Sequence, residues 1–117
     1  MCELCRMTIS DHRFGAEIVT TKGKVYKFDA AECMFNYISL DKINFDEIHS
    51  MYVIDCLNPG NLTDATSASY LISENFPSPM GANLSCYSSR NDAEANHKTF
   101  GGEVKSWTEI KNIFKLR

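Results

Sequence analysis

The strongest constraint on the fold is an order of segments that occurs twice along the chain. In the first half, residues 14–20 and 24–28 read as two strands on either side of Gly23, which predicts a β-hairpin. Residues 30–40 then carry apolar side chains at helical spacing, and residues 51–56 form a short apolar run rich in strand-forming residues. The first half is therefore predicted to fold as strand, strand, helix, strand, which is a ββαβ unit.

Local signals mark the ends of these elements. Asp29 is followed three residues later by Glu32, which is the spacing of a capping box and predicts the start of the helix. After the third strand, residues 58–61 read Asn-Pro-Gly-Asn, which is dense in turn-forming residues. The first unit is expected to end at this turn.

The second half repeats the plan. Residues 69–73 and 83–87 read as strands, separated by a loop that contains proline and glycine. Ser89, with Asp92 three residues later, predicts the start of a helix that Gly101 would end. The order strand, strand, helix therefore recurs.

Two further elements complete this half of the chain. A strand is expected through Val104 and Trp107. A final amphipathic helix is expected to place Ile110, Ile113 and Phe114 on one face and to pack across the end of the molecule.

The predicted fold class is α+β, with two small ββαβ units packed together. Residues 1–60 form the first unit, which includes an N-terminal Cys-x-x-Cys-x-Met motif, and residues 61–117 form the second, which includes a Pro-Met-Gly loop and the C-terminal helix. A chain of 117 residues, 44% of them hydrophobic, buries enough apolar surface to fold unaided.

Charge and hydropathy exclude two classes of partner. No run in the sequence approaches the roughly 18 apolar residues that a membrane span requires. The formal net charge is −3, and Lys and Arg are scattered rather than gathered in a stripe. We therefore expect neither nucleic acid nor a polybasic membrane contact.

Sulfur-bearing side chains are concentrated at the start of the sequence, where Cys2, Cys5 and Met7 lie within six residues. Thiolate and thioether sulfur are soft donors that favour Cu(I) over hard cations. A Cys-x-x-Cys pair also occurs in zinc sites and redox pairs, but the added Met7 favours copper. His12 follows closely enough to reach the same ion. The sequence therefore predicts a Cu(I) site here, partly open because it sits on a terminus and a loop.

Met80 is a further candidate ligand, because Pro79 and Gly81 hold it in a loop where a role in the core is harder to arrange. The alternative is that Met80 folds inward and fills a gap in the core, as most methionines do. The other internal sulfur residues fall within helix or strand patterns and are expected to be buried; they are Cys33, Met34, Met51, Cys56 and Cys86.

The chain is not expected to be an enzyme. A nucleophilic cysteine needs a base, an orienting group and a pocket, and the sequence contains neither a nucleophile elbow nor a glycine-rich phosphate loop. Two other classes stay open. One is a structural zinc-binding or interaction module, which would unfold without its metal, and the other is a thiol oxidoreductase that uses Cys2 and Cys5.

Several short blocks, in order, resemble the NosL family of copper-binding accessory proteins of nitrous oxide reductase. The blocks are Cys2-x-x-Cys5-x-Met7, Gly23-Lys24 leading into Tyr26-x-Phe28, Met51-Tyr52-Val53-x-Asp55, Asp64-Ala65-Thr66-Ser67-Ala68-x-Tyr70, Met80-Gly81, Asp92-Ala93 and Gly101-Gly102-x-Val104. Together they extend over nearly the whole chain.

The resemblance implies a lipid-anchored periplasmic metallochaperone of denitrification. It would bind one Cu(I) and deliver it to the assembly machinery of nitrous oxide reductase, which includes an ABC-type maturation complex. Its contact with the membrane would be a lipid anchor upstream of this sequence. The resemblance also implies two ββαβ units, a fold similar to that of the organomercurial lyase MerB. Its ligand candidates are Cys2, Cys5, Met7 and Met80.

The first half alone also resembles a YHS-type metal module. Asp29 stands where that pattern has a cysteine, and Cys33 is what remains of the second pair of ligands. A complete four-ligand zinc site of this kind is therefore not expected, whereas Cu(I) tolerates fewer sulfur ligands.

Overall fold

The computed structural model describes residue 2 and residues 14–58, 60–75 and 83–116 of the chain. The first of its two sheets is antiparallel, with the strand order β2-β1-β3-β4. Its strands are β1 (Ala16–Thr20), β2 (Val25–Phe28), β3 (Ile48–Ile54) and β4 (Leu62–Asp64). Between β2 and β3 the chain forms the helix α1 (Ala31–Ser39) and the short 3-10 helix η1 (Phe45–Glu47).

The second sheet is also antiparallel and has the strand order β6-β5-β7. Its strands are β5 (Ser69–Ile72), β6 (Leu84–Tyr87) and β7 (Glu103–Lys105). The helix α2 (Arg90–Phe100) connects β6 to β7, and α3 (Trp107–Phe114) follows β7.

The two sheets share one topology. In each, the first strand of a ββαβ unit lies in the centre, flanked by the second strand and by the strand after the helix: β2-β1-β3 in one sheet and β6-β5-β7 in the other. The predicted α+β fold of two ββαβ units is therefore confirmed. The additional strand β4 follows the first unit in the chain and pairs with β3.

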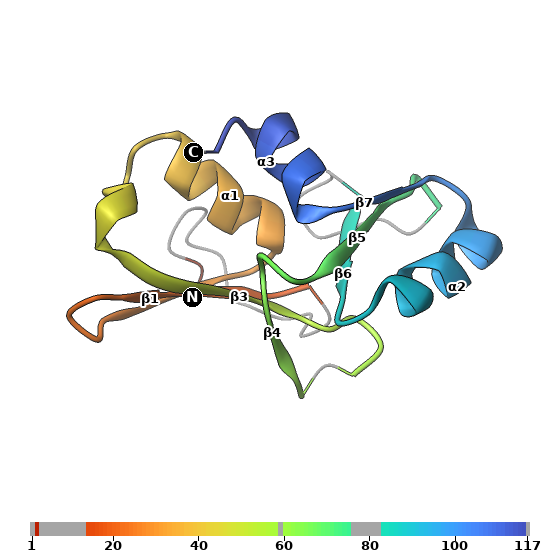
Figure 1. The fold of residues 1–117 in the computed structure, drawn as a ribbon, viewed down its shortest axis with the longest axis horizontal. Helices are drawn as coiled ribbons and strands as arrows, with labels where there is room; N and C mark the ends of the chain where they lie inside the picture. The colour runs from red at the N-terminus through yellow and green to blue at the C-terminus, as the bar shows by residue number, and fades with distance from the viewer. Residues whose placement is uncertain (1, 3–13, 59, 76–82, 117) are drawn as a thin grey trace.

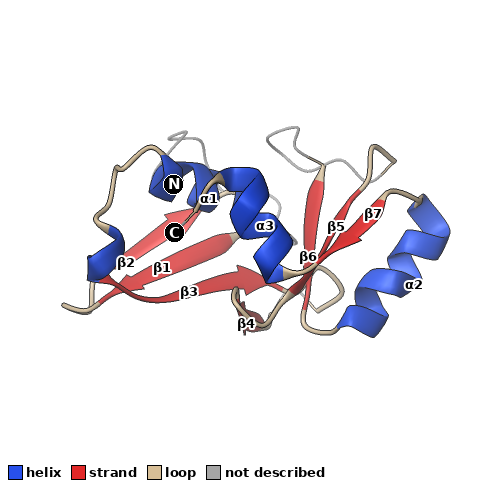
Figure 2. Ribbon diagram, turned by 45° about the horizontal axis from the view of Figure 1, so that its top comes forward, coloured by secondary structure: helices blue, strands red, loops and turns tan. Residues whose placement is uncertain are grey.

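The helices occupy two places along the 40 Å long axis of the molecule: α1 and α3 lie on one side of it, and α2 lies at one end (Figure 1). α1 contacts β1, β2 and β6, and α3 contacts both α1 and β5. These two helices lie side by side, with α1 over the first sheet and α3 against β5 of the second (Figure 2). α2 contacts all three strands of the second sheet and lies at the far end of the molecule.

A cluster of aromatic side chains joins the two units. The ring of Phe35 on α1 lies 6.1 Å from that of Tyr70 on β5, 5.8 Å from that of Trp107 and 5.1 Å from that of Phe114, measured between centroids. Phe35 and Tyr70 are buried in one continuous core cluster that draws on both sheets. The two units therefore share this core, and a second, smaller cluster of Cys56, Leu71, Tyr87 and Ala93 includes residues of the second sheet and α2.

The start of α1 differs from the expected capping box. Its N-cap residue is Ala30, and no side chain caps the helix. The backbone N–H of Ala31 instead donates a hydrogen bond to the carbonyl oxygen of Phe14 at 3.0 Å. Asp29 and Glu32 are both buried, so neither acts as a solvated cap.

The expected strand through Val104 and Trp107 ends earlier, because Trp107 is the first residue of α3. Ser106 and Glu109 form a reciprocal capping box, which stops β7 and starts the helix. On α3, Ile110 is buried as predicted, but Ile113 is 48% exposed.

Within the described part of the chain, none of the helices has the length and hydropathy that crossing a bilayer requires.

Candidate metal centre

Of the five predicted metal ligands, Cys2 lies in the described part of the structure. Its side chain is fully buried, with 0% of its surface exposed. The other candidates, Cys5, Met7, His12 and Met80, lie outside the described residues. The expectation of an open terminal site is therefore wrong for Cys2, which is a core residue.

The described residues that follow the two candidate segments belong to one core. Phe14 follows the N-terminal segment, and Leu84 follows the loop that contains Met80. Phe14, Leu84 and Cys2 are all buried members of the core cluster around Phe35.

The internal sulfur residues are buried, as the sequence predicted. They are Cys33, Met34, Met51, Cys56 and Cys86. Burial, followed by the nearby Cys56, Glu32 and Asp55, raises the pKa of the Cys86 thiol well above its ordinary value. Cys86 therefore stays protonated at neutral pH and is a poor ligand, because thiolate is the form that binds metal.

Among the residues whose positions are described, no group of three or more His, Cys, Asp or Glu side chains could hold a metal ion. His49 and His97 are exposed. A site of that kind would therefore need donors from elsewhere in the chain.

Asp29 is a residue whose position the sequence interpretation missed. Its side chain is 4% exposed, and its buried Oδ1 atom has no hydrogen-bond partner among the described residues. The signal in the sequence is that Asp29 replaces a cysteine of the YHS-type pattern. A carboxylate oxygen is a hard donor, so Asp29 does not suit Cu(I) and fits a harder cation better.

Two of the blocks that carry the family resemblance hold the fold together. The carboxylate of Asp55, at the end of β3, accepts hydrogen bonds from the backbone N–H of Leu57, from Asn58 and from Ser88 Oγ at 2.7 Å. Ser88 follows β6, so this contact ties the two units together. In a second block, the hydroxyl of the buried Tyr70 donates to the carbonyl oxygen of Ala65 at 2.6 Å.

The fold and these residues define a small α+β protein of two ββαβ units, with a sulfur-rich motif in its N-terminal segment. The NosL family model matches residues 1–114, and the chain belongs to the NosL family.

Two known proteins of the family are similar to this chain. The copper-binding lipoprotein NosL of Stutzerimonas stutzeri is 30% identical over 115 residues, which cover 93% of this chain. The match spans 60% of that relative's length. The crystal structure of the copper chaperone NosL from Shewanella denitrificans is 25% identical and has a TM-score of 0.78. That match covers 92% of this chain and 87% of the crystallised one.

Proposed function

We propose that this protein is a non-enzymatic copper chaperone that binds Cu(I) and delivers it to the assembly machinery of nitrous oxide reductase. The observation that carries the proposal is the likeness to the copper chaperone from Shewanella denitrificans, which extends over 92% of the chain at a TM-score of 0.78. The relative from Stutzerimonas stutzeri is likewise named for copper binding. The recipients would be nitrous oxide reductase and its ABC-type maturation complex.

The donors of this chain suit that cargo. Cys2, Cys5, Met7 and Met80 offer thiolate and thioether sulfur, and His12 is a further candidate. Cu(I) is a soft ion that sulfur ligands select over Ca²⁺ or Mg²⁺. Because Cys2 is buried, an incoming ligand from a recipient cannot attack there first. We therefore assign the start of ligand exchange to Cys5, Met7 and Met80, with Cys2 as the inner ligand.

The core supports a carrier over a structural zinc module. Phe35, Tyr70 and Ile110 are buried in a continuous apolar cluster that joins both units. Apolar burial of this extent stabilises a fold without metal, whereas a structural zinc domain unfolds when its ion is removed. A carrier needs this independence, because it must stay folded after it has released its ion.

The name of one relative supports a proposal about cellular location. The relative from Stutzerimonas stutzeri is named a lipoprotein. We infer that this protein acts in the periplasm, attached to the membrane through a lipid anchor upstream of the present sequence.

An anaerobic competition titration tests the metal and its ligands together. Cu(I) and Zn(II) would be offered to the reduced protein and to the Cys5→Ser and Met80→Ala variants. Met51→Leu is the matched control, because Met51 is buried in the core and leucine conserves its volume. We expect the wild type and the control to bind one Cu(I) that zinc does not displace, and both ligand variants to bind it at least about tenfold more weakly.

The titration also discriminates between the classes of protein. Displacement of copper by zinc would favour the structural module. Equal affinity for Cu(I) in the wild type and both ligand variants would show that Cys5 and Met80 are not ligands. Affinity for Cu(I) should fall as the pH is lowered from about 8 to 5, because protons compete with the metal for thiolate. An affinity that stays constant over this range would contradict thiolate ligation.

A further inference from the structure

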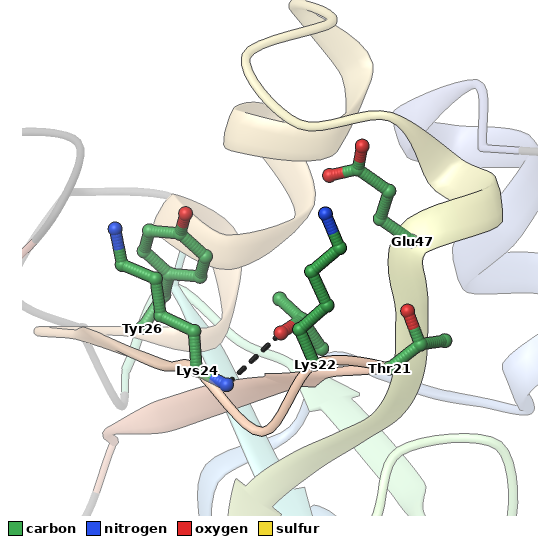
Figure 3. Close-up of a pocket in the computed structure, with 6 residues that line it drawn as sticks. Thr21, Lys22, Lys24, Tyr26 and Glu47 are labelled. Atoms are coloured by element: carbon green, nitrogen blue, oxygen red, sulfur yellow. Dashed lines mark hydrogen bonds between the residues drawn. The ribbon is translucent and has the colours of Figure 1, made fainter.

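The tip of the β1–β2 hairpin forms a pocket at the end of the molecule opposite α2 (Figure 1). The pocket comprises about 440 Å³ of space, including the part open to solvent. It is lined by Thr20, Thr21, Lys22, Lys24, Tyr26 and Glu47. Figure 3 shows the side chains of Lys22, Lys24, Tyr26 and Glu47 standing on the same side of the hairpin.

Hydrogen bonds fix the walls of this pocket. The backbone N–H of Lys24 donates to Thr20 Oγ1 at 3.0 Å, and that of Thr20 donates to the carbonyl oxygen of Lys24 at 2.9 Å. Thr21 N–H donates to the carbonyl oxygen of Glu47 at 2.9 Å, which ties the turn to the start of β3. Gly23 has φ +84°, a conformation that glycine adopts without strain. The turn is therefore preorganised, which lowers the entropic cost of binding.

The polar groups around the pocket are mostly hydrogen-bond donors. The ammonium group of Lys24 lies over the ring of Tyr26, 4.8 Å from its centroid. Lys22 and Lys24 are exposed, and neither takes part in any ion pair between described residues. Two ammonium groups and the Tyr26 hydroxyl thus line the pocket together with one carboxylate, that of Glu47. The pocket has an excess of donors for an anionic ligand.

We propose that this pocket is a docking site for an acidic segment of a partner protein, one of whose carboxylates binds between Lys22 and Lys24. The charges are complementary, because the hairpin at 20–28 contains three lysines and no acidic residue in a chain whose formal net charge is −3. The position at one end of the 40 Å long axis leaves the pocket accessible to a second protein.

An anionic membrane fits this site less well. Basic clusters that bind anionic lipid have about 4–8 Lys or Arg side chains, whereas this hairpin has three lysines. Lys27 follows Tyr26 in β2 and so lies on the opposite face of the sheet, where it is paired across the strands with Glu17. Two lysines beside a carboxylate, in a pocket of fixed shape, suit a single carboxylate better than a lipid surface.

This inference goes beyond the proposed copper function and does not depend on it. The pocket consists of described residues of the first unit and contains none of the candidate metal ligands. Its test uses the metal-free protein, so failure of copper binding and failure of docking are separate results.

The test is a titration of the ¹⁵N-labelled protein with hexaglutamate peptide, followed by amide chemical shifts. We expect the largest shifts at residues 20–26. The double variant Lys22→Gln/Lys24→Gln should bind the peptide at least about fivefold more weakly. Lys98→Gln is the matched control, because Lys98 is an exposed lysine on α2 at the other end of the molecule. The control should bind like the wild type, and the variants should fold because the replaced side chains are exposed.

Three outcomes would overturn the proposal. The first is an absence of peptide-induced shifts at residues 20–26, and the second is equal affinity in the wild type and the double variant. The third is binding to phosphatidylglycerol vesicles, lost in the double variant, without binding of hexaglutamate, which would assign the lysines to a membrane. Hexaglutamine peptide controls for contacts that do not involve charge, and it should produce no shifts at the pocket.

Discussion

Residues that the family resemblance singles out divide into two groups, one structural and one chemical. Asp55 and Tyr70 hold backbone and side-chain groups in place, and the structure shows their partners directly. Cys5, Met7 and Met80 are the chemical candidates, and their roles stay predictions. Sequence patterns could propose these donors because thiolate and thioether have distinctive chemistry. Sequence patterns could not predict that Cys2 is buried. Cys2 lies outside the helices and strands, so no periodic pattern of apolar residues includes it.

Asp55 makes a testable contribution to stability. Burial alone would raise its pKa, but the hydrogen bonds that it accepts from Ser88, the backbone of Leu57 and Asn58 outweigh burial and lower its pKa below the ordinary value of 3.8. A depressed folded pKa means that the ionised form stabilises the fold. This stability is present above pH 3.8 and is lost as the pH falls through the lower folded pKa.

We therefore expect Asp55→Asn to lower the free energy of unfolding at pH 7 by about 1–3 kcal/mol. The difference from wild type should shrink below about pH 4, where the wild-type carboxylate also becomes protonated. Urea denaturation of both proteins between pH 7 and 3 measures this. A difference that stays constant over the whole range would show that the charge of Asp55 does not contribute.

Elements were predicted in the right order but with imperfect ends. The ββαβ pattern could be found because apolar side chains recur at strand or helix spacing and turn residues separate the segments, and because Ser89 caps α2 as predicted. β4 was missed because its three residues are too few to show alternation. β3 begins at Ile48, earlier than the predicted residue 51. The prediction missed its first residues because His49 and Ser50 are polar and precede the apolar run. Trp107 was assigned to a strand on the strength of its β propensity, although the capping box of Ser106 and Glu109 starts a helix there.

The junction between α2 and β7 depends on its two glycines in different ways. Gly101 and Gly102 both have positive φ, +76° and +86°. A Cβ atom on Gly101 would meet open space, whereas one on Gly102 would collide with the carbonyl oxygen of Ile72 on β5. The close approach at Gly102 occurs next to Glu103, where β7 pairs with Ile72 of β5.

We expect Gly101→Ala to destabilise the fold by about 1–3 kcal/mol through backbone strain alone, and Gly102→Ala to cost more, because strain and collision add. Gly60→Ala is the control, since Gly60 has no positive φ and open space around it. Its unfolding midpoint in urea should match that of the wild type. If Gly101→Ala and Gly102→Ala lost the same free energy of unfolding, the contact between β5 and β7 would be shown to relax at little cost.

At the scale of the whole molecule, the larger of two core clusters is shared by the two similar units. Phe35 and Ile110 come from helices of different units and belong to the same buried cluster. Sequence patterns gave both units, but they could not predict how the units pack, because that depends on contacts between distant residues. The contacts of α1 with β6 and of α3 with β5 join residues that are distant in the sequence.

This shared core leads to an expectation about metal removal. Treatment of the reduced protein with chelators for copper and zinc should leave a folded protein with a cooperative thermal transition. Addition of Cu(I) should raise the midpoint, since an ion that binds the folded form stabilises it by mass action. Calorimetry with and without chelator measures both effects. Unfolding on chelation would identify a structural metal instead of a cargo.

In the proposed function, Cu(I) binds to sulfur donors of the N-terminal motif and of the second unit. The most direct measurement is X-ray absorption at the copper edge on the Cu(I)-loaded protein, together with Cys5→Ser and Met80→Ala. We expect a first shell of about two or three sulfur scatterers that loses sulfur in each variant. A first shell dominated by nitrogen or oxygen, or one that is the same in all three proteins, would contradict the claim.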